Sequence, residues 1–497
     1  MDIAPDFSAF ARIYGEGRPQ VVFTRAIADL ETPVSAFLKL GHARANAFLL
    51  ESVQGGETRG RYSIIGLKPD LIWRCRDGKA EINRDALSKP DAFEPDKSAA
   101  KPLEALKRLV HSVRMDLPEG LPPMAAGLFG YLGYDMVRLM ERLPSAPPDA
   151  LGLPDAVLLR PTITAIFDTV RDQIILVTPV WPDAARDARE AYDNAKHRLQ
   201  ETIAELARAP AKETQVPMSL GAVESNTAHA DYLSMVTKAK EYILAGDVFQ
   251  VVPSQRFRRS FPQHPFALYR ALRRLNPSPF LYFLNFPGFA IVGSSPEILV
   301  RLREGVVTIR PIAGTRPRGV TDTEDKKLAE QLLADPKERA EHLMLLDLGR
   351  NDVGRVAETG SVNVTAQFFI ERYSHVMHLV SNVEGRIRKG LDAVDALIAG
   401  FPAGTLSGAP KVRAMEIIDE LEKEKRGPYA GAVGYFAADG SMDTCIVLRT
   451  AVVKDGMMYV QAGGGVVADS DPETEYQETV NKAKALMAAA DEAMRAE

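Results

Sequence analysis

The pattern of apolar and polar positions divides the chain into two strand-rich parts joined by a polar segment. In the first part, short apolar runs predict antiparallel strands, with turns at Asp77 and Gly78 and near Arg171 and Asp172. Residues 182–209 then adopt a helical spacing of apolar positions in a charged, alanine-rich stretch, which predicts one amphipathic helix. The following stretch contains prolines and small polar residues with little periodicity, so we expect an interdomain linker at 209–227.

After the linker, strand-like runs alternate with helical stretches. We expect a helix over 230–245 that ends at Gly246, because glycine commonly terminates helices. Further helices are expected at about 324–347, 391–425 and 473–495. The strand-like runs are FQVVPSQRF, PFLYFLNF, FAIVGSS, VVTIRP, VNVTAQFF, AGAVGYF, CIVLRTAVV and MMYVQAG. This grouping predicts an α+β fold with large antiparallel sheets, and domains at 1–208 and 228–497.

Composition and charge argue against several classes of protein. The 497 residues are 46% hydrophobic and 26% charged, with a formal net charge of -5, as in ordinary globular proteins that do not bind nucleic acid. No apolar run approaches the length of a bilayer span, and the first residues lack the pattern of a secretory signal, so we expect a cytoplasmic protein without membrane attachment. Cys75 and Cys445 lie in strand-like runs and are expected to be buried structural thiols.

Two of the predicted helices each carry a pair of glutamates three residues apart, Glu338 with Glu341 and Glu475 with Glu478. Residues at this spacing lie on one face of a helix, and in the first helix that face continues through leucines. Four carboxylates from two helices would form an oxygen-rich site that suits Mg2+. The alternative is that each pair lies on a solvated helix face.

A run of glycines, Gly463, Gly464 and Gly465, directly follows a predicted strand. Unhindered backbone amides at such a turn can close around a carboxylate or phosphate. Together with Ala468 the run also fits a dinucleotide-binding spacing, but no helix opens at Gly465 and Pro472 follows closely. We therefore favour a turn that holds an anion, with a plain strand bulge as the alternative.

Two polar side chains lie in otherwise apolar strand-like runs. Arg449 in CIVLRTAVV needs an anionic partner, which is either a substrate carboxylate or an internal salt bridge. His378 in SHVMHLVSNVEG could transfer a proton or polarise a leaving group, or it could be an ordinary core histidine with satisfied hydrogen bonds.

Taken together, residues 228–490 resemble the chorismate-utilising enzymes. The segments that carry the resemblance occur in the family's order: PIAGTRPRG, KERAEHLMLLDLGRND, HVMHLVSNVEG, FPAGTLSGAPK, GPYAGAVGYF, IVLRT, QAGGGVVADSDPETEYQET and NKA. The resemblance implies a large α+β fold of stacked antiparallel sheets flanked by helices, with the active site in a cleft.

The resemblance also implies roles for particular residues. Glu341 and Glu478 would bind Mg2+ directly, with Glu338 and Glu475 contacting the ion through water, and the ion would hold the ring carboxylate of chorismate. His378 is associated with the elimination step, and Glu338 is our candidate proton donor to the departing C4 hydroxyl. The residues expected around the substrate are Gly314, Thr315, Thr405 and Lys482 on the ring side, and Tyr429, Arg449 and Gly463, Gly464 and Gly465 at the enolpyruvyl carboxylate.

Two positions select among the members of this family. Aminodeoxychorismate synthases generally carry a lysine nucleophile where this chain has Ala313, so we expect ammonia to attack C2 directly. Relatives that add water use a lysine base where this chain has Gln250. The segments LLES at 49–52 and RYSIIG from Arg61 resemble the anthranilate synthases, which convert chorismate and ammonia to anthranilate and pyruvate in tryptophan biosynthesis. The alternatives are an aminodeoxychorismate synthase or a non-catalytic sensor of chorismate or another aromatic compound.

The resemblance further implies a partner and a regulator. Neither cysteine lies in the setting of a glutaminase nucleophile, so a separate glutamine amidotransferase subunit is expected to supply ammonia, and free ammonium should also support the reaction. In the family, the LLES and NPSPF segments form a pocket for the feedback inhibitor L-tryptophan, and Phe280 stands here where a tyrosine is common. The expected pocket residues are Ser52, Asn276, Pro277, Ser278, Pro279 and Phe280.

Overall fold

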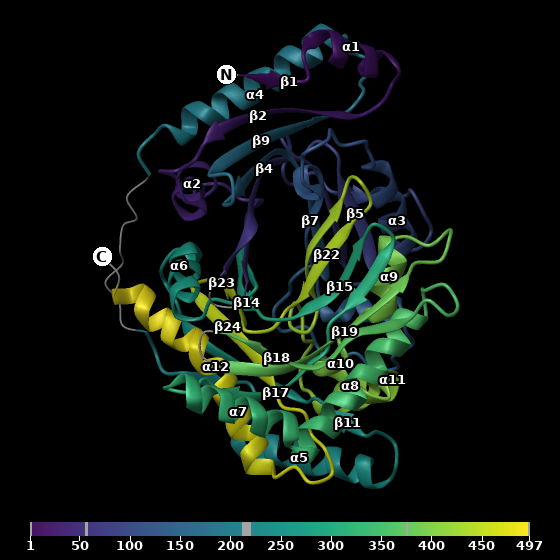
Figure 1. The fold of residues 1–497 in the computed structure, drawn as a ribbon, viewed down its shortest axis with the longest axis vertical. Coiled ribbons are helices and arrows are strands. Elements are labelled where there is room, and N and C mark those ends of the chain that lie inside the picture. The colour runs from purple at the N-terminus through teal and green to yellow at the C-terminus, as the bar shows by residue number, and fades with distance from the viewer. Residues whose placement is uncertain (1, 55–57, 211–219, 374–375, 496–497) are drawn as a thin grey trace.

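Long antiparallel strands dominate the structure, a computed structural model that describes residues 2–54, 58–210, 220–373 and 376–495 (Figure 1). The helices of the first part are α1 (Phe7–Gly15), α2 (Pro33–Leu40), α3 (Pro102–Ser112) and α4 (Ala188–Leu206). Its strands are β1 (Ile3–Ala4), β2 (Gln20–Ile27), β3 (Ala47–Gln54), β4 (Thr58–Arg76), β5 (Lys79–Asn83), β6 (Glu94–Pro95), β7 (Gly127–Leu132), β8 (Ala156–Asp168) and β9 (Gln173–Val180).

The second part contains most of the helices. These are α5 (His229–Leu244), α6 (Pro265–Leu275), α7 (Asp322–Ala334), α8 (Pro336–Gly354), α9 (Ala393–Gly400), α10 (Gly404–Ser407), α11 (Lys411–Leu421) and α12 (Pro472–Arg495). Its strands are β10 (Glu224–Ser225), β11 (Gln250–Val251), β12 (Ser254–Ser260), β13 (Phe280–Phe286), β14 (Phe289–Ser295), β15 (Ile298–Arg303), β16 (Val306–Ile309), β17 (Ile312–Pro317), β18 (Asn363–Arg372), β19 (Val376–Arg386), β20 (Gly408–Ala409), β21 (Ala432–Ala437), β22 (Met442–Ile446), β23 (Thr450–Lys454) and β24 (Met457–Gly463). The α+β class with large antiparallel sheets is confirmed.

Strands from the two parts of the chain hydrogen-bond to one another. β3 pairs antiparallel with β13, which places Ser52 opposite Phe280, and β7 pairs antiparallel with β21. In Figure 1 the N-terminal elements α1, β2, β9 and α4 lie at the upper end, and α5, α7 and α12 lie at the lower end. The sheet network is therefore continuous across the expected domains, and the boundaries 1–208 and 228–497 stay a prediction.

Two of the long helices expected from the sequence are interrupted. The stretch expected at 324–347 forms α7 and α8, and Asp335 ends the first while its carboxylate caps the second by accepting from the Lys337 and Glu338 amides. The stretch expected at 391–425 forms α9, α10 and α11, with prolines at the breaks. The helices expected at 230–245 and 473–495 are confirmed as α5 and α12, and that at 182–209 is the shorter α4.

Three further predictions concern the ends of elements and the linker. The turn at Asp77 and Gly78 is confirmed, because both residues adopt positive φ between β4 and β5. Most of the expected linker, 211–219, lies outside the described residues, whereas Glu224–Ser225 forms β10 beside β12. Cys75 and Cys445 are both buried and unpaired, as expected. Of the helices in the described ranges, none combines the length and apolar character that a bilayer crossing requires.

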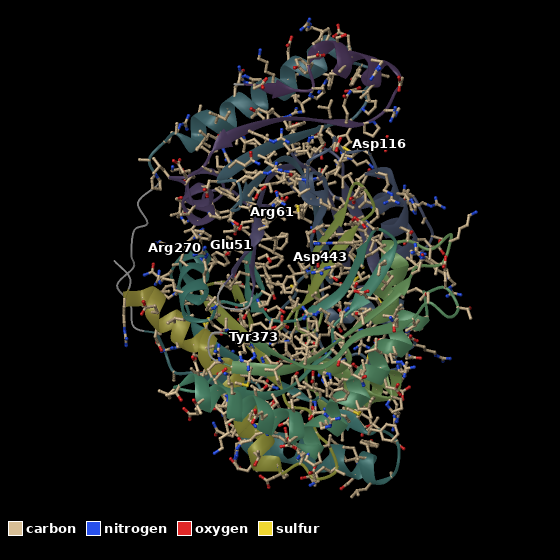
Figure 2. The ribbon with its side chains drawn as sticks, viewed as in Figure 1. Glu51, Arg61, Asp116, Arg270, Tyr373 and Asp443 are labelled. Atoms are coloured by element: carbon tan, nitrogen blue, oxygen red, sulfur yellow. The ribbon has the colours of Figure 1, made fainter. Side chains whose placement is uncertain are left out.

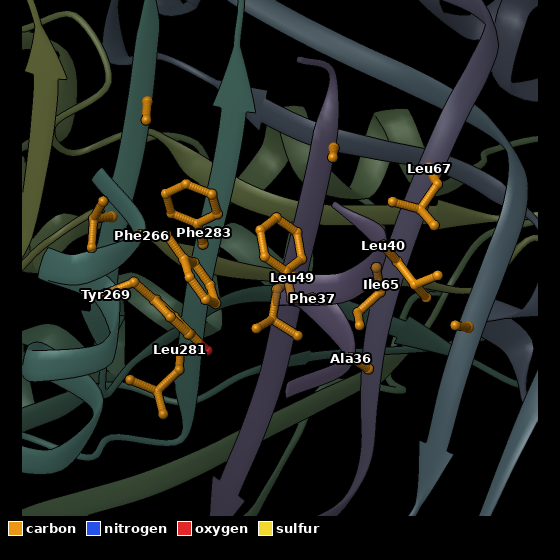
Figure 3. Packing of buried hydrophobic residues seen from close by; sticks show 14 of the residues in the cluster. Ala36, Phe37, Leu40, Leu49, Ile65, Leu67, Phe266, Tyr269, Leu281 and Phe283 are labelled. Carbon is orange, nitrogen blue, oxygen red and sulfur yellow. The ribbon is translucent and has the colours of Figure 1, made fainter. Parts of the chain in front are cut away.

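A fully buried aromatic cluster connects the two parts of the chain (Figure 3). Phe37 of α2 lies 4.6 Å from Phe266 of α6 and 5.4 Å from Phe283 of β13 between ring centroids. Leu49 of β3 belongs to the same cluster. This packing fixes α6, and with it the loop that leads to β13, against the first part of the chain.

Replacing Phe283 with alanine is expected to lower the free energy of unfolding by about 3–5 kcal/mol, because it leaves a cavity among these rings. Denaturant titration followed by circular dichroism measures the loss. The matched control is Leu275→Ala on the neighbouring helix, whose side chain is 41% exposed and whose removal should change stability by about 0.5 kcal/mol or less. Equal stability of the two variants would contradict the assigned packing.

Candidate active site

The helices α8 and α12 bring their glutamates into one electrostatic environment. Burial raises the pKa of Glu341, and the neighbouring charges of Glu338 and Glu478 raise it further. Burial likewise raises the pKa of Glu475, with contributions from Glu478 and Glu341. Carboxylates interact in this way only when they are close together, so the two acidic pairs are neighbours and do not lie on separate solvated faces.

Two cations and an amide contact these carboxylates. Arg316 donates to Glu338 over 2.8 Å, Lys482 forms a 2.6 Å ion pair with Glu478, and Gln250 donates to Glu341 over 3.3 Å. The Oε2 atom of Glu475 is buried and has no hydrogen-bond partner in the described part of the chain. Across those residues, no three acidic, histidine or cysteine side chains already lie at metal-ligand spacing.

This donor set fits a hard divalent cation. All the groups offer carboxylate oxygens, which Mg2+ prefers, and the unpartnered oxygen of Glu475 is an acceptor that a hydrated ion can satisfy. The repulsion among the carboxylates is also what a divalent charge relieves. The ligand roles of Glu341 and Glu478, and the water-mediated roles of Glu338 and Glu475, stay predictions.

A histidine lies beside this cluster with one nitrogen free. His378 of β19 has Nδ1 3.1 Å from the carbonyl oxygen of Gly314 and 3.1 Å from the Thr315 hydroxyl, both on β17. Since a carbonyl only accepts, Nδ1 carries the hydrogen and Nε2 presents a lone pair. Nε2 is buried and unpartnered among the described residues, and burial, assisted by Arg449, lowers the pKa of His378 to about 4. A satisfied core histidine would not leave this nitrogen free.

Gly314 is required where it stands. Its φ is +58°, and an added Cβ would lie 2.8 Å from Oε2 of Glu338. A larger residue would therefore both strain the backbone and push into the carboxylate. The glycine allows β17 to pass directly against the start of α8.

Arg449 does not lie inside a strand, contrary to the sequence prediction. The strand breaks after Ile446 and resumes at Thr450, and Arg449 adopts a positive φ of 48° in the break. Burial lowers the pKa of its guanidinium, and Tyr373 and Glu297 act on that pKa in the opposite direction. Within the described ranges its side chain makes no hydrogen bond or ion pair, so the internal salt bridge of the alternative interpretation is not found there. A desolvated guanidinium of this kind is suited to bind an anion.

The glycine run lies against both Tyr429 and the start of α12. The Gly463 amide faces the Tyr429 hydroxyl, whose pKa burial raises to about 12, and Lys482 donates to the Gly463 carbonyl over 2.9 Å. An added Cβ on Gly464 would lie 2.8 Å from Oε2 of Glu475, and one on Gly465 would lie 2.6 Å from Nε2 of Gln250. No helix begins at Gly465, which excludes the dinucleotide-binding arrangement.

One acidic residue of the site, Glu297, was not predicted from the sequence. Glu297 precedes β15 and is buried, and Thr405 donates to its carboxylate over 3.1 Å. Burial raises the pKa of Glu297 to about 8, although Arg449 and Lys482 act in the opposite direction. The available signal was a glutamate directly before an apolar strand, in SSPEILV, and it has no paired carboxylate to draw attention to it.

The predicted regulatory segments meet at a separate cavity of about 700 Å3. Ser52, Pro279 and Phe280 line it, whereas Asn276, Pro277 and Ser278 are not among the described residues of its wall. In Figure 2 the cavity residues Glu51, Arg61, Asp443 and Tyr373 lie around the middle of the molecule. Tyr373 also acts on Arg449, so the cavity ends close to the substrate site.

Comparisons with known proteins agree with this arrangement. Residues 47–488 match the family described as chorismate binding enzyme. Anthranilate synthase component 1 of Cereibacter sphaeroides is 59% identical, covering 98% of this chain and 97% of the relative, and that of Pseudomonas aeruginosa is 48% identical, covering 97% of both.

Solved structures extend the comparison to the fold. The crystal structure of anthranilate synthase component I from Streptococcus pneumoniae is 38% identical with a TM-score of 0.76, covering 93% of this chain and 99% of that one. The menaquinone-specific isochorismate synthase of Escherichia coli, at 20% identity and a TM-score of 0.72 over 97% and 98% of the two chains, shares the fold. This chain belongs to the chorismate-binding enzyme family, in the branch of the anthranilate synthase component 1 proteins.

Proposed function

We propose that this chain converts chorismate and ammonia to anthranilate, pyruvate and water. The observation that carries the proposal is the meeting of the α8 and α12 carboxylates, together with Arg449, whose desolvated guanidinium acts on Glu297 as Lys482 of α12 does and has no partner in the described residues. Chorismate carries two carboxylates, so its site must provide compensating charge at two separate places. Arg449 supplies one of them, at the enolpyruvyl carboxylate, together with Tyr429 and the Gly463 amide.

The compensating charge at the second place would come from a Mg2+ ion held by Glu341 and Glu478, with Glu338 and Glu475 contacting it through water. The bound ion would neutralise the ring carboxylate of the substrate within a group of negatively charged side chains. Lys482 forms an ion pair with Glu478, and Arg316 forms one with Glu338. Both ion pairs have to rearrange when the metal ion takes up these carboxylates. Thr315, Thr405 and Lys482 would orient the ring side.

Two proton transfers accompany the chemistry. Ammonia forms a bond to C2 as the C4 hydroxyl leaves as water, and the hydroxyl requires a proton. Glu297 suits this task because a carboxyl with a pKa of about 8 is protonated at neutral pH. Glu338, the donor expected from the sequence, is instead engaged by Arg316, which donates a hydrogen bond to its carboxylate over 2.8 Å. Ala313 offers only a methyl group, so the side chain at this position supplies no nucleophile to compete with ammonia at C2.

The second transfer removes the proton at C2 as the enolpyruvyl group leaves as pyruvate and the ring becomes aromatic. The free lone pair on Nε2 of His378 suits a base for this step. Replacing His378 with phenylalanine is therefore expected to slow anthranilate formation by about 10²–10⁴-fold while chorismate is still consumed. Chromatography of the products, beside the fluorescence assay for anthranilate, measures both. Equal loss of consumption and anthranilate would remove His378 from the elimination step.

Regulation by L-tryptophan is proposed from the cavity that Ser52 and Phe280 line. Tryptophan should inhibit the ammonium-dependent reaction, and Phe280→Ala should raise the inhibitory concentration about tenfold, since one aromatic contact contributes about 0.5–1.5 kcal/mol. Calorimetric titration with tryptophan gives the same comparison without turnover. Unchanged activity of the unaltered protein at saturating tryptophan would end this part of the proposal.

Ammonia in the cell is proposed to come from a glutamine amidotransferase subunit. Both cysteines of this chain are buried, and burial raises the pKa of Cys75 to about 12, so neither offers a reactive thiolate. Two unpaired thiols also fit the cytoplasmic location that we propose for this enzyme of tryptophan biosynthesis.

The experiment that tests the proposal mixes the chain alone with chorismate, Mg2+ and ammonium and follows anthranilate fluorescence. Steady fluorescence growth that a chelator abolishes is expected. Accumulation of a non-fluorescent amino product without pyruvate would indicate an aminodeoxychorismate synthase, and binding of chorismate without turnover would indicate a sensor. Either result would overturn the proposal.

A further inference from the structure

Tyr373 belongs to the wall of the large cavity and also reaches the active site. It directly follows β18, and its side chain is only 6% exposed. Tyr373 acts on the pKa of Arg449, and Glu297 acts on that of Tyr373. Figure 2 shows Tyr373 below the other cavity residues Glu51 and Asp443, toward the end of the molecule that carries α7 and α12. No step of the proposed reaction uses this buried tyrosine.

The ring of Tyr373 meets the imidazole of His378 edge to face. The two ring centroids lie 5.4 Å apart and the ring planes are inclined by 66°, a favourable geometry for an aromatic pair. Hydrogen bonds hold the imidazole at Nδ1, through the Gly314 carbonyl and the Thr315 hydroxyl. Bonds at one edge of a ring leave its plane free to tilt, and a tilt would redirect the lone pair on Nε2. The tyrosine ring therefore supplies a contact that fixes the direction of this lone pair.

The hydroxyl of Tyr373 is anchored from the side of the cavity. It donates to Glu371 over 3.1 Å, and Arg310 donates to the same carboxylate oxygen over 3.1 Å. Glu371 lies opposite His378 in the pairing of β18 with β19, so the anchor and the imidazole belong to one hairpin. Burial, with Glu371 beside the hydroxyl, raises the pKa of Tyr373 well above its ordinary value. The hydroxyl therefore stays protonated and remains a donor to its anchor.

We propose that Tyr373 is a positioning residue for the elimination step, and that it holds the imidazole of His378 through an aromatic contact anchored at Glu371. This inference rests on the proposed function, in which Nε2 of His378 takes the proton from C2. A base must point its lone pair at the proton that it removes, and a displacement of about 1 Å can lower a rate about 10²-fold. Amination precedes this step and does not use His378, so loss of the Tyr373 ring should slow elimination selectively.

The experiment measures amination and elimination separately in the full chain with chorismate, Mg2+ and ammonium. Tyr373→Leu removes the ring and is expected to lower anthranilate formation by about tenfold or more. Chorismate consumption and the KM for chorismate should stay within about threefold, so that the aminated intermediate accumulates. Tyr373→Phe keeps the ring and should hold anthranilate formation within about threefold of the unaltered protein. Chromatography of chorismate, intermediate and anthranilate gives both rates.

Two comparisons separate positioning from a general loss of structure. Tyr435→Leu is the matched control, because Tyr435 is also 6% exposed in the cavity wall and its ring packs against Phe129 of β7. It should leave the ratio of aminated intermediate to anthranilate unchanged. Adding Tyr373→Leu to His378→Phe should lower anthranilate formation no further, since a residue that acts only through His378 has nothing left to position.

The product ratios decide the role of Tyr373. Selective loss of elimination in Tyr373→Leu, its rescue in Tyr373→Phe and the absence of a further loss in the double variant support the proposal. Equal loss of chorismate consumption and anthranilate formation in Tyr373→Leu, the same product ratio in Tyr435→Leu, or additive losses in the double variant overturn it. Should Tyr373→Leu fail to fold, Glu371→Gln weakens the anchor alone and should shift the ratio in the same direction. An unchanged ratio in Glu371→Gln then overturns the proposal.

The imidazole itself provides a measurement that needs no turnover. The Nδ1–H proton of His378, identified in NMR spectra by its loss in His378→Phe, should give a sharp signal in the unaltered protein and in Tyr373→Phe. The signal should broaden in Tyr373→Leu, and a signal that stays sharp there overturns the proposal. Absence of anthranilate formation by the unaltered chain contradicts the proposed function, while this signal still decides whether Tyr373 holds the imidazole.

Discussion

Replacing Glu341 or Glu478 with glutamine is expected to lower anthranilate formation by about 10³-fold or more, since a bound metal contributes several kcal/mol to catalysis. Each change keeps the shape of the side chain and removes one anionic ligand from the cluster. The variants should stay folded, because burial and neighbouring carboxylates already raise the pKa of Glu341 and a neutral amide relieves that repulsion. Their melting temperature should therefore equal or exceed that of the unaltered protein without metal.

Metal binding by these variants can be measured through the melting temperature, beside a control variant. Mg2+ should raise the melting temperature of the unaltered protein and leave that of the variants nearly unchanged, because only binding to the folded state stabilises it. The matched control is Glu473→Gln, which removes an exposed carboxylate from the first turn of α12. If Glu473→Gln lost as much activity as Glu478→Gln, the loss would come from the overall negative charge of α12. The assignment of Glu478 as a metal ligand would then be wrong.

Replacing Glu297 with glutamine is expected to lower the rate of chorismate consumption by about 10²–10⁴-fold, the usual contribution of a positioned acid. With a pKa raised to about 8, Glu297 carries its proton below that pH and loses it above. The kcat/KM of the unaltered enzyme should therefore fall as the pH rises through about 8. This descending limb should be absent from the residual activity of the glutamine variant.

Glu338→Gln is the direct comparison for that prediction. Glu338 is the donor expected from the sequence, and its ion pair with Arg316 is the reason to prefer Glu297. A profile that keeps its descending limb in Glu338→Gln and loses it in Glu297→Gln agrees with the structure. The reverse pattern would return the proton-donor role to Glu338.

The acidic helices could be predicted from the sequence because their geometry is local. Glutamates three residues apart must share a helix face, and the pairs at Glu338 and Glu475 were therefore visible in advance. The convergence of α8 with α12 could not be seen, since it depends on how distant strands and helices pack. The raised pKa values of Glu341 and Glu475 are the structural sign of that convergence.

Features without a local signature escaped prediction. Arg449 sits among apolar residues that suggest an unbroken strand, and only the three-dimensional path shows the break at positive φ that frees its guanidinium. Glu297 is a single acid, and its raised pKa comes from burial beneath segments distant in sequence. The short helices α1, α2 and α3 were hidden for a similar reason, since the strand pattern around them dominated the first part of the chain.

The central claim is that Glu341 and Glu478 together bind one divalent cation that holds the substrate. A crystal structure of the protein with Mn2+ in place of Mg2+, located by its anomalous scattering, tests it most directly. One ion is expected, bonded to an oxygen of Glu341 and an oxygen of Glu478 at about 2.1 Å, as for small hard cations. An ion bound elsewhere, or these two carboxylates turned away from each other at saturating Mn2+, would contradict it.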